Sequence, residues 1–185
     1  MVNCKYGDTI SKWLKYYNIP IRNDPKRYDS IRSNSLSVLQ REFVIGSMLG
    51  DGHLSVRSKS CRLRFCHGLP QLEYLKWKKD MMGELVQQNI HFHKQKTRNS
   101  TICSFQTITH PEFSYYHKLF YTNSNEKIVP DCIESMITDF TLAVWVMDDG
   151  WKCHDQRTFR FCTDSFTRSH QELLHWHPPR QSPAE

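Results

Sequence analysis

Hydrophobic and polar residues follow two different periods along residues 36–130. Where apolar side chains recur every three or four residues, the spacing predicts a helix with one buried face. Where they recur every second residue, it predicts a strand with one buried face. The resulting order is helix, strand, strand, helix, strand, strand, helix. The predicted elements are 37–49, 53–57, 61–66, 70–85, 91–97, 101–108 and 109–120.

Polar residues at the helix starts support this order. Ser37 and Gln40 fit a capping box for the first helix, and Thr109 and Glu112 fit one for the third. Pro70 is expected to open the second helix. The predicted apolar face of that helix carries Tyr74, Trp77, Met81 and Leu85.

The first predicted hairpin has one apolar and one basic face, because successive side chains of a strand point to opposite sides. The turn between its strands falls at residues 58–60. The apolar face is expected to carry Leu54, Val56, Leu63 and Phe65, and the other face Arg57, Arg62 and Arg64.

The pattern restarts after residue 137. An apolar helix from Phe140 to Met147, capped by Thr138 or Asp139, ends at Asp149, and a second basic hairpin closes with Arg160-Phe161-Cys162. The earlier segment from Asp51 to Cys66 matches it element for element. We interpret this as an internal duplication in which Asp51 and Asp149 occupy equivalent places.

Residues 1–35 stand apart from the duplicated region. Asp8 can cap a short amphipathic helix that stops before Pro20, and residues 23–35 form a polar linker. The helix is similar to the recognition half of a helix-turn-helix, but a plain amphipathic helix fits equally well.

Charge is unevenly distributed in this chain of 185 residues with a net charge of +6. Residues 53–110 hold ten Lys or Arg against three Asp or Glu, whereas residues 111–164 hold five against nine. A basic block mixed with Thr, Ser, Gln and His is typical of a surface that faces phosphates, although on charge alone a solvated face is an equal alternative.

The apolar runs are short and broken by charge, and the first residues do not resemble a signal peptide, so we expect an intracellular protein. A mitochondrion, a chloroplast and a bacterial cytoplasm remain equal alternatives. The seven cysteines are odd in number and have no C-x-x-C spacing, which favours reduced thiols over a zinc site or a disulfide framework.

The duplicated acidic residues suggest a metal site. Gly46 and Gly50 would let the two apolar helices approach closely, which would bring Asp51 and Asp149 together at one end. Two carboxylates beside free helix carbonyls form an oxygen site for a hard cation such as Mg²⁺. A lone Asp-Gly after a helix is usually an ordinary turn. Two copies, each followed by a basic hairpin, favour hydrolysis of a phosphodiester.

These residues carry a family resemblance. The segments VIGSMLGDG (44–52) and LAVWVMDDG (142–150) resemble the two motifs of intron-encoded LAGLIDADG homing endonucleases. The resemblance covers about residues 36–174 and implies a mixed α/β (α+β) fold with a duplicated αββαββα unit and saddle-shaped antiparallel sheets. It also implies Mg²⁺-dependent (or Mn²⁺-dependent) cleavage of double-stranded DNA by a monomer without a membrane partner.

The resemblance further implies roles for individual residues. The carboxylates of Asp51 and Asp149 would bind metal, with the backbone carbonyls of Gly50 and Asp148 as further ligands. His67 and Lys127 are the proposed additional catalytic residues near the cleaved phosphates, with an ordinary surface position as the alternative for each. The predicted DNA contacts are Ser55, Arg57, Arg62, Arg64, Lys94, Lys96, Lys152, Thr158 and Arg160.

The sequence departs from the family pattern in its second half. The first repeat is expected over 36–130, a partial second repeat over 131–176 and a disordered tail over 177–185. The second repeat would then be incomplete. A nucleic-acid-binding protein without cleavage, such as an RNA maturase for its own intron or a decayed DNA binder, is therefore the alternative function.

Overall fold

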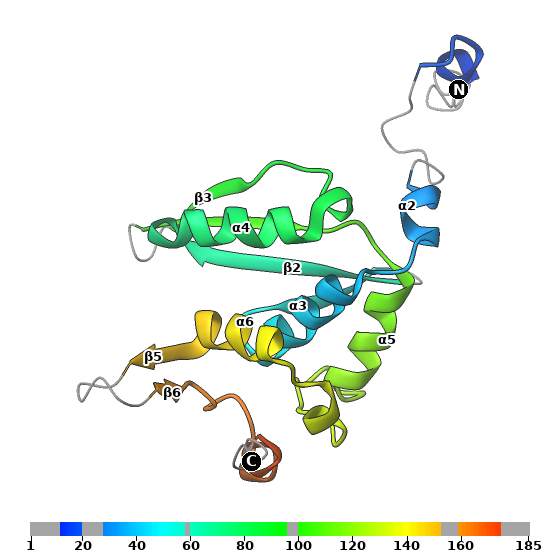
Figure 1. Cartoon of the computed structure of the whole chain (residues 1–185). Helices are drawn as coiled ribbons and strands as arrows, with labels where there is room; N and C mark the ends of the chain where they lie inside the picture. Colours follow the sequence, from blue (N-terminus) through cyan, green and yellow to red (C-terminus); the bar gives the residue numbers. More distant parts are fainter. Residues whose placement is uncertain (1–11, 20–27, 58–59, 96–99, 153–158, 175–185) are drawn as a thin grey trace, which may run out of the picture. The chain divides into compact units, whose positions relative to one another are not determined.

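The computed structural model describes residues 12–19, 28–57, 60–95, 100–152 and 159–174 (Figure 1). The chain divides into two compact units, Met1–Asn34 and Ser35–Glu185. In the first unit, residues 12–16 are helical and α2 spans Asp29–Ser33. The predicted cap Asp8 lies outside the described residues. The boundaries predicted at residues 130 and 176 stay predictions.

The second unit begins with the predicted order of seven elements. The Ser37–Gln40 capping box is present, with both reciprocal hydrogen bonds formed. Short 3₁₀ turns at Leu69–Gln71 and Gly83–Leu85 flank the second helix. The elements are α3 (Val38–Leu49), β1 (His53–Arg57), β2 (Ser60–Gly68), α4 (Leu72–Met82), β3 (His91–Gln95), β4 (Ser100–Gln106) and α5 (Pro111–Phe120).

The four strands form one antiparallel sheet in the order β1-β2-β4-β3. Helix α4 packs on β2 and β4, and α5 packs on β1 and β2. Leu63, Phe65 and Phe105 are almost completely buried, whereas Arg64 and Cys66, which alternate with them, are exposed. One face of the sheet therefore supports the core and the other is open to solvent.

The buried face of α4 differs from the prediction. Leu75, Lys78 and Met82 are buried, and Tyr74 and Trp77 lie half-buried on the flank. Of the predicted face, Leu85 is buried and Trp77 packs against Phe43, but apolarity alone could not show that a lysine faces inward here. Its partner is an aspartate far away in the sequence, as described below.

The cap of α5 also differs. His110, and not Thr109, is the N-cap, and its Nδ1 accepts a hydrogen bond from the Glu112 backbone N–H. The Glu112 side chain instead accepts from the Arg41 guanidinium at 2.9 Å and from the Leu36 backbone N–H at 2.8 Å. Pairing with a cation on α3 has replaced the local capping box.

After α5, the chain forms a 3₁₀ turn at Ile133–Met136. It continues with α6 (Asp139–Asp149), which Thr138 caps. Strands β5 (Gly150–Lys152) and β6 (Phe159–Phe161) form a separate two-stranded sheet, and α7 spans Arg168–Leu173. Among the described residues, no helix is long and apolar enough to cross a membrane.

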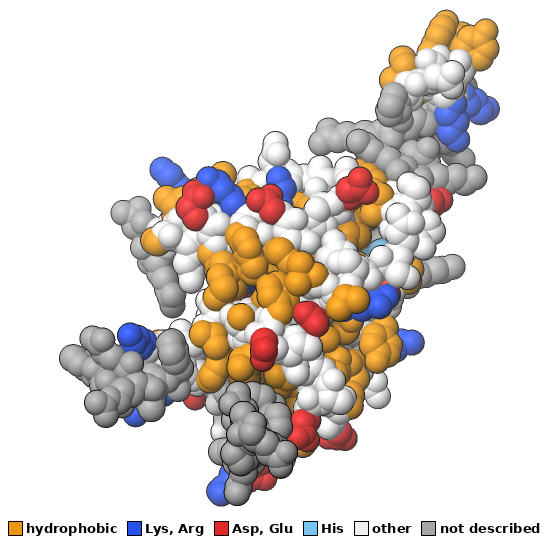
Figure 2. Space-filling view, in the orientation of Figure 1, with side chains coloured by type: hydrophobic (Ala, Val, Ile, Leu, Met, Phe, Trp, Pro, Cys, Tyr) orange, Lys and Arg blue, Asp and Glu red, His pale blue; other side chains and the backbone are white. Residues whose placement is uncertain are grey.

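Helices α3 and α6 pack directly against each other, which joins the two repeats (Figure 1). A Cβ atom at Gly46 would lie 2.5 Å from the Thr141 carbonyl oxygen and 2.8 Å from Val144 Cβ. Only glycine therefore permits this approach. Apolar side chains also gather in the middle of the face shown in Figure 2, around these helices and α4.

Candidate active site

The helix pair brings the ends of the two acidic motifs together. Asp51 follows the C-terminal end of α3, and Asp148 and Asp149 are the last residues of α6. The Asp51 backbone N–H donates a hydrogen bond to Asp148 Oδ2 at 3.2 Å. The two segments are therefore tied at the point where they meet.

Gly50 makes room for the Asp148 side chain. A Cβ atom at Gly50 would lie 2.4 Å from Asp148 Cβ and 2.7 Å from its Oδ2. Gly50 and Asp148 occupy equivalent positions in the two repeats, so the missing side chain of one accommodates the carboxylate of the other. The sequence prediction assigned only the backbone carbonyl of Asp148. In the sequence, this packing was indicated only by a small residue, Gly50, standing at the position equivalent to the acidic Asp148.

The Asp148 carboxylate is fully buried and paired. Lys78 Nζ lies 2.5 Å from Asp148 Oδ1, and the Tyr74 hydroxyl donates to the same oxygen at 2.6 Å. Burial lowers the pKa of Lys78, and the Asp148 carboxylate opposes that shift. Burial and the same carboxylate raise the pKa of Tyr74, so its hydroxyl keeps its proton and acts as a donor. Neither contact was visible in the sequence, because the partner of both residues lies in the other repeat.

His67 is a buried ring beside Asp51. Its side chain is 1% exposed, and Nδ1 lies 3.6 Å from Asp51 Oδ2 and 3.2 Å from Gln71 Oε1. Its Nε2 lies 3.1 Å from Lys78 Nζ. Burial and the Lys78 charge lower the pKa of His67, which favours neutral imidazole. A lysine can only donate, so Nε2 accepts and Nδ1 carries the proton.

Lys127 contacts the backbone on both sides of Asp51. Its Nζ donates to the carbonyl oxygens of Gly50 at 2.6 Å and Gly52 at 3.3 Å. Burial lowers the pKa of Lys127 to about 8, although the neighbouring carboxylates oppose the shift. The Gly50 carbonyl that was predicted as a metal ligand therefore has the Lys127 ammonium as its partner here.

Asp51, His67 and Asp148 form a group that could hold a divalent cation, and Asp149 does not belong to this group. Burial, together with the negative charges of Asp51 and Asp148, raises the pKa of Asp149 to about 6. A cation would relieve this repulsion, and oxygen donors suit Mg²⁺ or Mn²⁺. The Asp51 side chain is 43% exposed, so a ligand can reach it. Ligand atoms of Asp51, His67 and Asp148 all lie within 4.8 Å of one another.

The solvent-facing side of the four-stranded sheet is basic. The pairs Ser55↔Arg62 and His53↔Arg64 place Ser55, Arg62 and Arg64 on one face, together with Arg57. The Arg62 guanidinium donates to Ser55 Oγ at 3.4 Å. This face begins two residues after Asp51, so it leads away from the carboxylates.

The strand register divides the remaining predicted DNA contacts. In β3, Lys94 pairs with Thr101 and Phe92 with Cys103, which places Lys94 on the opposite face from Arg64. The exposed His91 and His93 share the face of Arg64. The single sequence could not reveal this because one residue of register reverses every side chain.

In the second sheet, the exposed Arg160 pairs with Trp151, and the exposed Lys152 pairs with Phe159. The register therefore puts Arg160 and Lys152 on opposite faces. Phe161, which alternates with Arg160, lies against Trp145 of α6, so Arg160 points away from the helix as Arg64 does. Lys96 and Thr158 lie outside the described residues.

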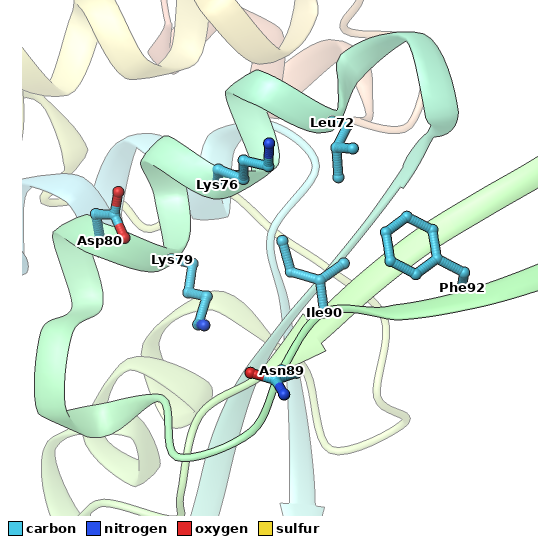
Figure 3. Close-up of a pocket in the computed structure, with 7 residues that line it drawn as sticks. All are labelled: Leu72, Lys76, Lys79, Asp80, Asn89, Ile90 and Phe92. Carbon is cyan, nitrogen blue, oxygen red and sulfur yellow. The ribbon is translucent and has the colours of Figure 1, made fainter.

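A pocket of about 370 Å³ lies apart from the carboxylates, between α4 and β3 (Figure 3). Asp80 is among its lining residues but neither acidic motif end is, so we do not assign the chemistry to it. Its lining residues are Leu72, Lys76, Lys79, Asp80, Asn89, Ile90 and Phe92.

The fold and the site together define a duplicated mixed α/β protein with an acidic cluster where its repeats meet and a basic sheet beside it. Residues 41–176 match the model of the LAGLIDADG DNA endonuclease family, and the chain belongs to that family. This confirms both the predicted family and the predicted fold class.

Similar proteins include both nucleases and a maturase. Cytochrome b mRNA maturase bI2 of Debaryomyces hansenii is 30% identical over 88% of this chain, and the chain spans 64% of that protein. DNA endonuclease I-ChuI of Chlamydomonas applanata is 28% identical over 72% of this chain and 68% of its own length. The structure of homing endonuclease I-WcaI bound to its DNA recognition sequence matches with a TM-score of 0.68. That match is 25% identical and covers 86% of this chain and 75% of the other.

Proposed function

We propose that this protein is a site-specific endonuclease that hydrolyses phosphodiester bonds of double-stranded DNA with a divalent cation. The observation that carries the proposal is the meeting of two acidic motif ends beside a basic sheet in a chain of this family. The similarity to a DNA-bound homing endonuclease supports DNA as the substrate. Because one chain supplies both motif ends, we propose that the protein acts as a monomer.

The residues of the site have separate roles in this proposal. Asp51 and Asp149 would hold Mg²⁺ or Mn²⁺, which when bound activates water and stabilises the leaving oxygen. Lys127 carries a positive charge beside them that can stabilise a phosphate as its negative charge develops. The buried ring of His67 favours a role through Asp51 over direct contact with DNA. Arg62 and Arg64 would hold the DNA backbone.

Substitution of the two carboxylates tests the proposal. Asp51→Asn and Asp149→Asn should each abolish cutting of a target selected from a plasmid library of randomised inserts. DNA affinity in Ca²⁺ should stay nearly unchanged, because the basic strands are untouched. Asp80→Asn, on the exposed side of α4, is the matched control and should cut normally. Wild-type cleavage rates in either site variant would exclude the proposed roles.

A maturase is the second candidate function, because the bI2 protein of D. hansenii is similar over most of this chain. An RNA-binding maturase could use the same basic sheet without cleavage. If the wild-type protein cuts no sequence in the library but binds its own intron RNA, this alternative is favoured. The two carboxylates would then be dispensable for RNA binding.

A further inference from the structure

Lys78 is an unusual residue for a helix that packs on a sheet. Its side chain is fully buried, and its ammonium lies 4.5 Å from the Phe65 ring centroid and 4.6 Å from that of Tyr74. It has two polar partners, Asp148 Oδ1 and His67 Nε2. A single cation of the first repeat therefore contacts the end of α6 and the end of β2.

Stability does not explain this arrangement well. Moving an ammonium and a carboxylate out of water is costly, and their mutual attraction roughly offsets that cost. Apolar residues of similar volume often stabilise a core as much or more. An apolar residue at position 78 would also match its neighbours Leu75 and Met82. A buried charge pair next to the acidic cluster therefore points to a functional role.

Both contacts of Lys78 lead to Asp51. On one side, Asp148 Oδ1 is held by Lys78 while its Oδ2 accepts the Asp51 backbone N–H at 3.2 Å. On the other, the bond to His67 Nε2 leaves the His67 Nδ1–H for Gln71 Oε1 at 3.2 Å, with Asp51 Oδ2 at 3.6 Å from the same nitrogen. The first contact holds the backbone of Asp51, and the second places a ring N–H beside its side chain.

We propose that Lys78 is a positioning residue that fixes Asp51 against the second repeat for metal binding. It acts through Asp148 and His67 and touches neither DNA nor the cation. The inference rests on the proposed function, because it assumes that Asp51 binds a divalent cation. Residues that orient metal ligands in this way typically affect metal affinity or activity by 10- to 100-fold.

The test measures Mn²⁺ binding to the full chain by electron paramagnetic resonance, without DNA. The site is identified as the binding that Asp51→Asn removes. Lys78→Met should weaken it by about 10- to 100-fold. Lys76→Met, the same change on the exposed side of α4, is the matched control and should bind as wild type. If the wild type has no Mn²⁺ site that depends on Asp51, the proposed function and the role of Lys78 both fail. If the wild type has such a site and Lys78→Met binds as tightly, only the role of Lys78 fails.

A double variant separates positioning from folding. Lys78→Met alone leaves Asp148 buried without its cation and can destabilise the protein. Lys78→Met with Asp148→Asn removes both charges and should melt close to the wild type, yet bind Mn²⁺ about 10- to 100-fold more weakly. A folded double variant with wild-type Mn²⁺ affinity would overturn the proposal, since the pair would then serve stability alone.

A measurement on the wild-type protein needs no variant. The ¹⁵N chemical shifts of the His67 ring report which nitrogen carries the proton. The proposal requires the proton on Nδ1, because Lys78 donates to Nε2. A His67 ring protonated on Nε2 would overturn it regardless of how the variants fold.

Discussion

At the scale of single residues, the acidic cluster is a source of electrostatic strain. Asp149 carries a pKa of about 6 because it is partly buried beside Asp51 and Asp148. Its carboxyl group therefore loses its proton at a higher pH in the folded protein than in the unfolded chain, where its pKa is near 3.8. Such an arrangement is typical of a functional site, where charge is kept at a cost in stability.

This strain predicts the pH dependence of an Asp149→Asn variant without divalent cations. The folded pKa lies above the unfolded one, so ionised Asp149 costs stability, and the cost grows from about pH 4 to pH 6 and then stays constant. The variant should therefore be more stable than the wild type at pH 7.5. Its free energy of unfolding should be higher by about 1 kcal/mol, after allowance for solvent screening of the half-exposed group. The difference should vanish near pH 4. Melting curves at several pH values measure it, and a variant less stable than the wild type at pH 7.5 would contradict it.

At the scale of secondary structure, the pair α3 and α6 decides where the site forms. No β-sheet joins the two helices. They pack where Gly46 lies against Thr141 and Val144. Thr141 also donates from its hydroxyl to the Glu42 carbonyl at 3.4 Å. The position of Asp149 relative to Asp51 therefore depends on side-chain packing between two helices.

Gly46→Ala should separate the helices. The added Cβ would meet the Thr141 carbonyl at 2.5 Å, so α6 would have to move, at a cost of about 1–3 kcal/mol. For a domain of this size we expect Tm to fall by roughly 2–4 °C per kcal/mol. Gly68→Ala is the control, because its Cβ would meet only Pro70 Cδ at 3.6 Å. An unchanged Tm for Gly46→Ala would show that the helices are not tightly packed.

At the scale of the whole molecule, charge is divided between the two faces of the first sheet. The helix-covered face holds the core, and the other carries Ser55, Arg62 and Arg64. Partial burial lowers the pKa of Arg62, and repulsion by Arg57 and Arg64 lowers it further. A polyanion such as DNA would relieve the repulsion.

The open face should be visible in the salt dependence of DNA binding in Ca²⁺. Arg62→Ala and Arg64→Ala should each weaken binding and reduce the slope of log K against log salt by about one phosphate contact. Lys94→Ala, on the opposite face, should leave the slope unchanged. A reduced slope for Lys94→Ala with none for Arg64→Ala would assign DNA binding to the other face.

Much of the first repeat follows from local physics. Capping at Ser37, period-two alternation in β1 and β2 and turn residues act between near neighbours, so the sequence by itself determined the order of elements. The internal duplication marked Asp51 and Asp149 as equivalent, because repetition is visible without coordinates. The register of β3 was not predictable, since Lys94 and His93 are both polar and both exposed, and fit either face of the strand.

Only the tertiary structure decided how the site is held. The inward side of α4 is chosen by the pairing of Lys78 with Asp148, which lies in the other repeat, and no local pattern marks a lysine as buried. The burial of His67 and the contact of Lys127 with the Gly50 carbonyl likewise join segments far apart in the chain. The acidic residues were thus evident from their own spacing. The cations and hydrogen bonds around them arise only in the folded chain, because burial and charge pairing depend on neighbours in space.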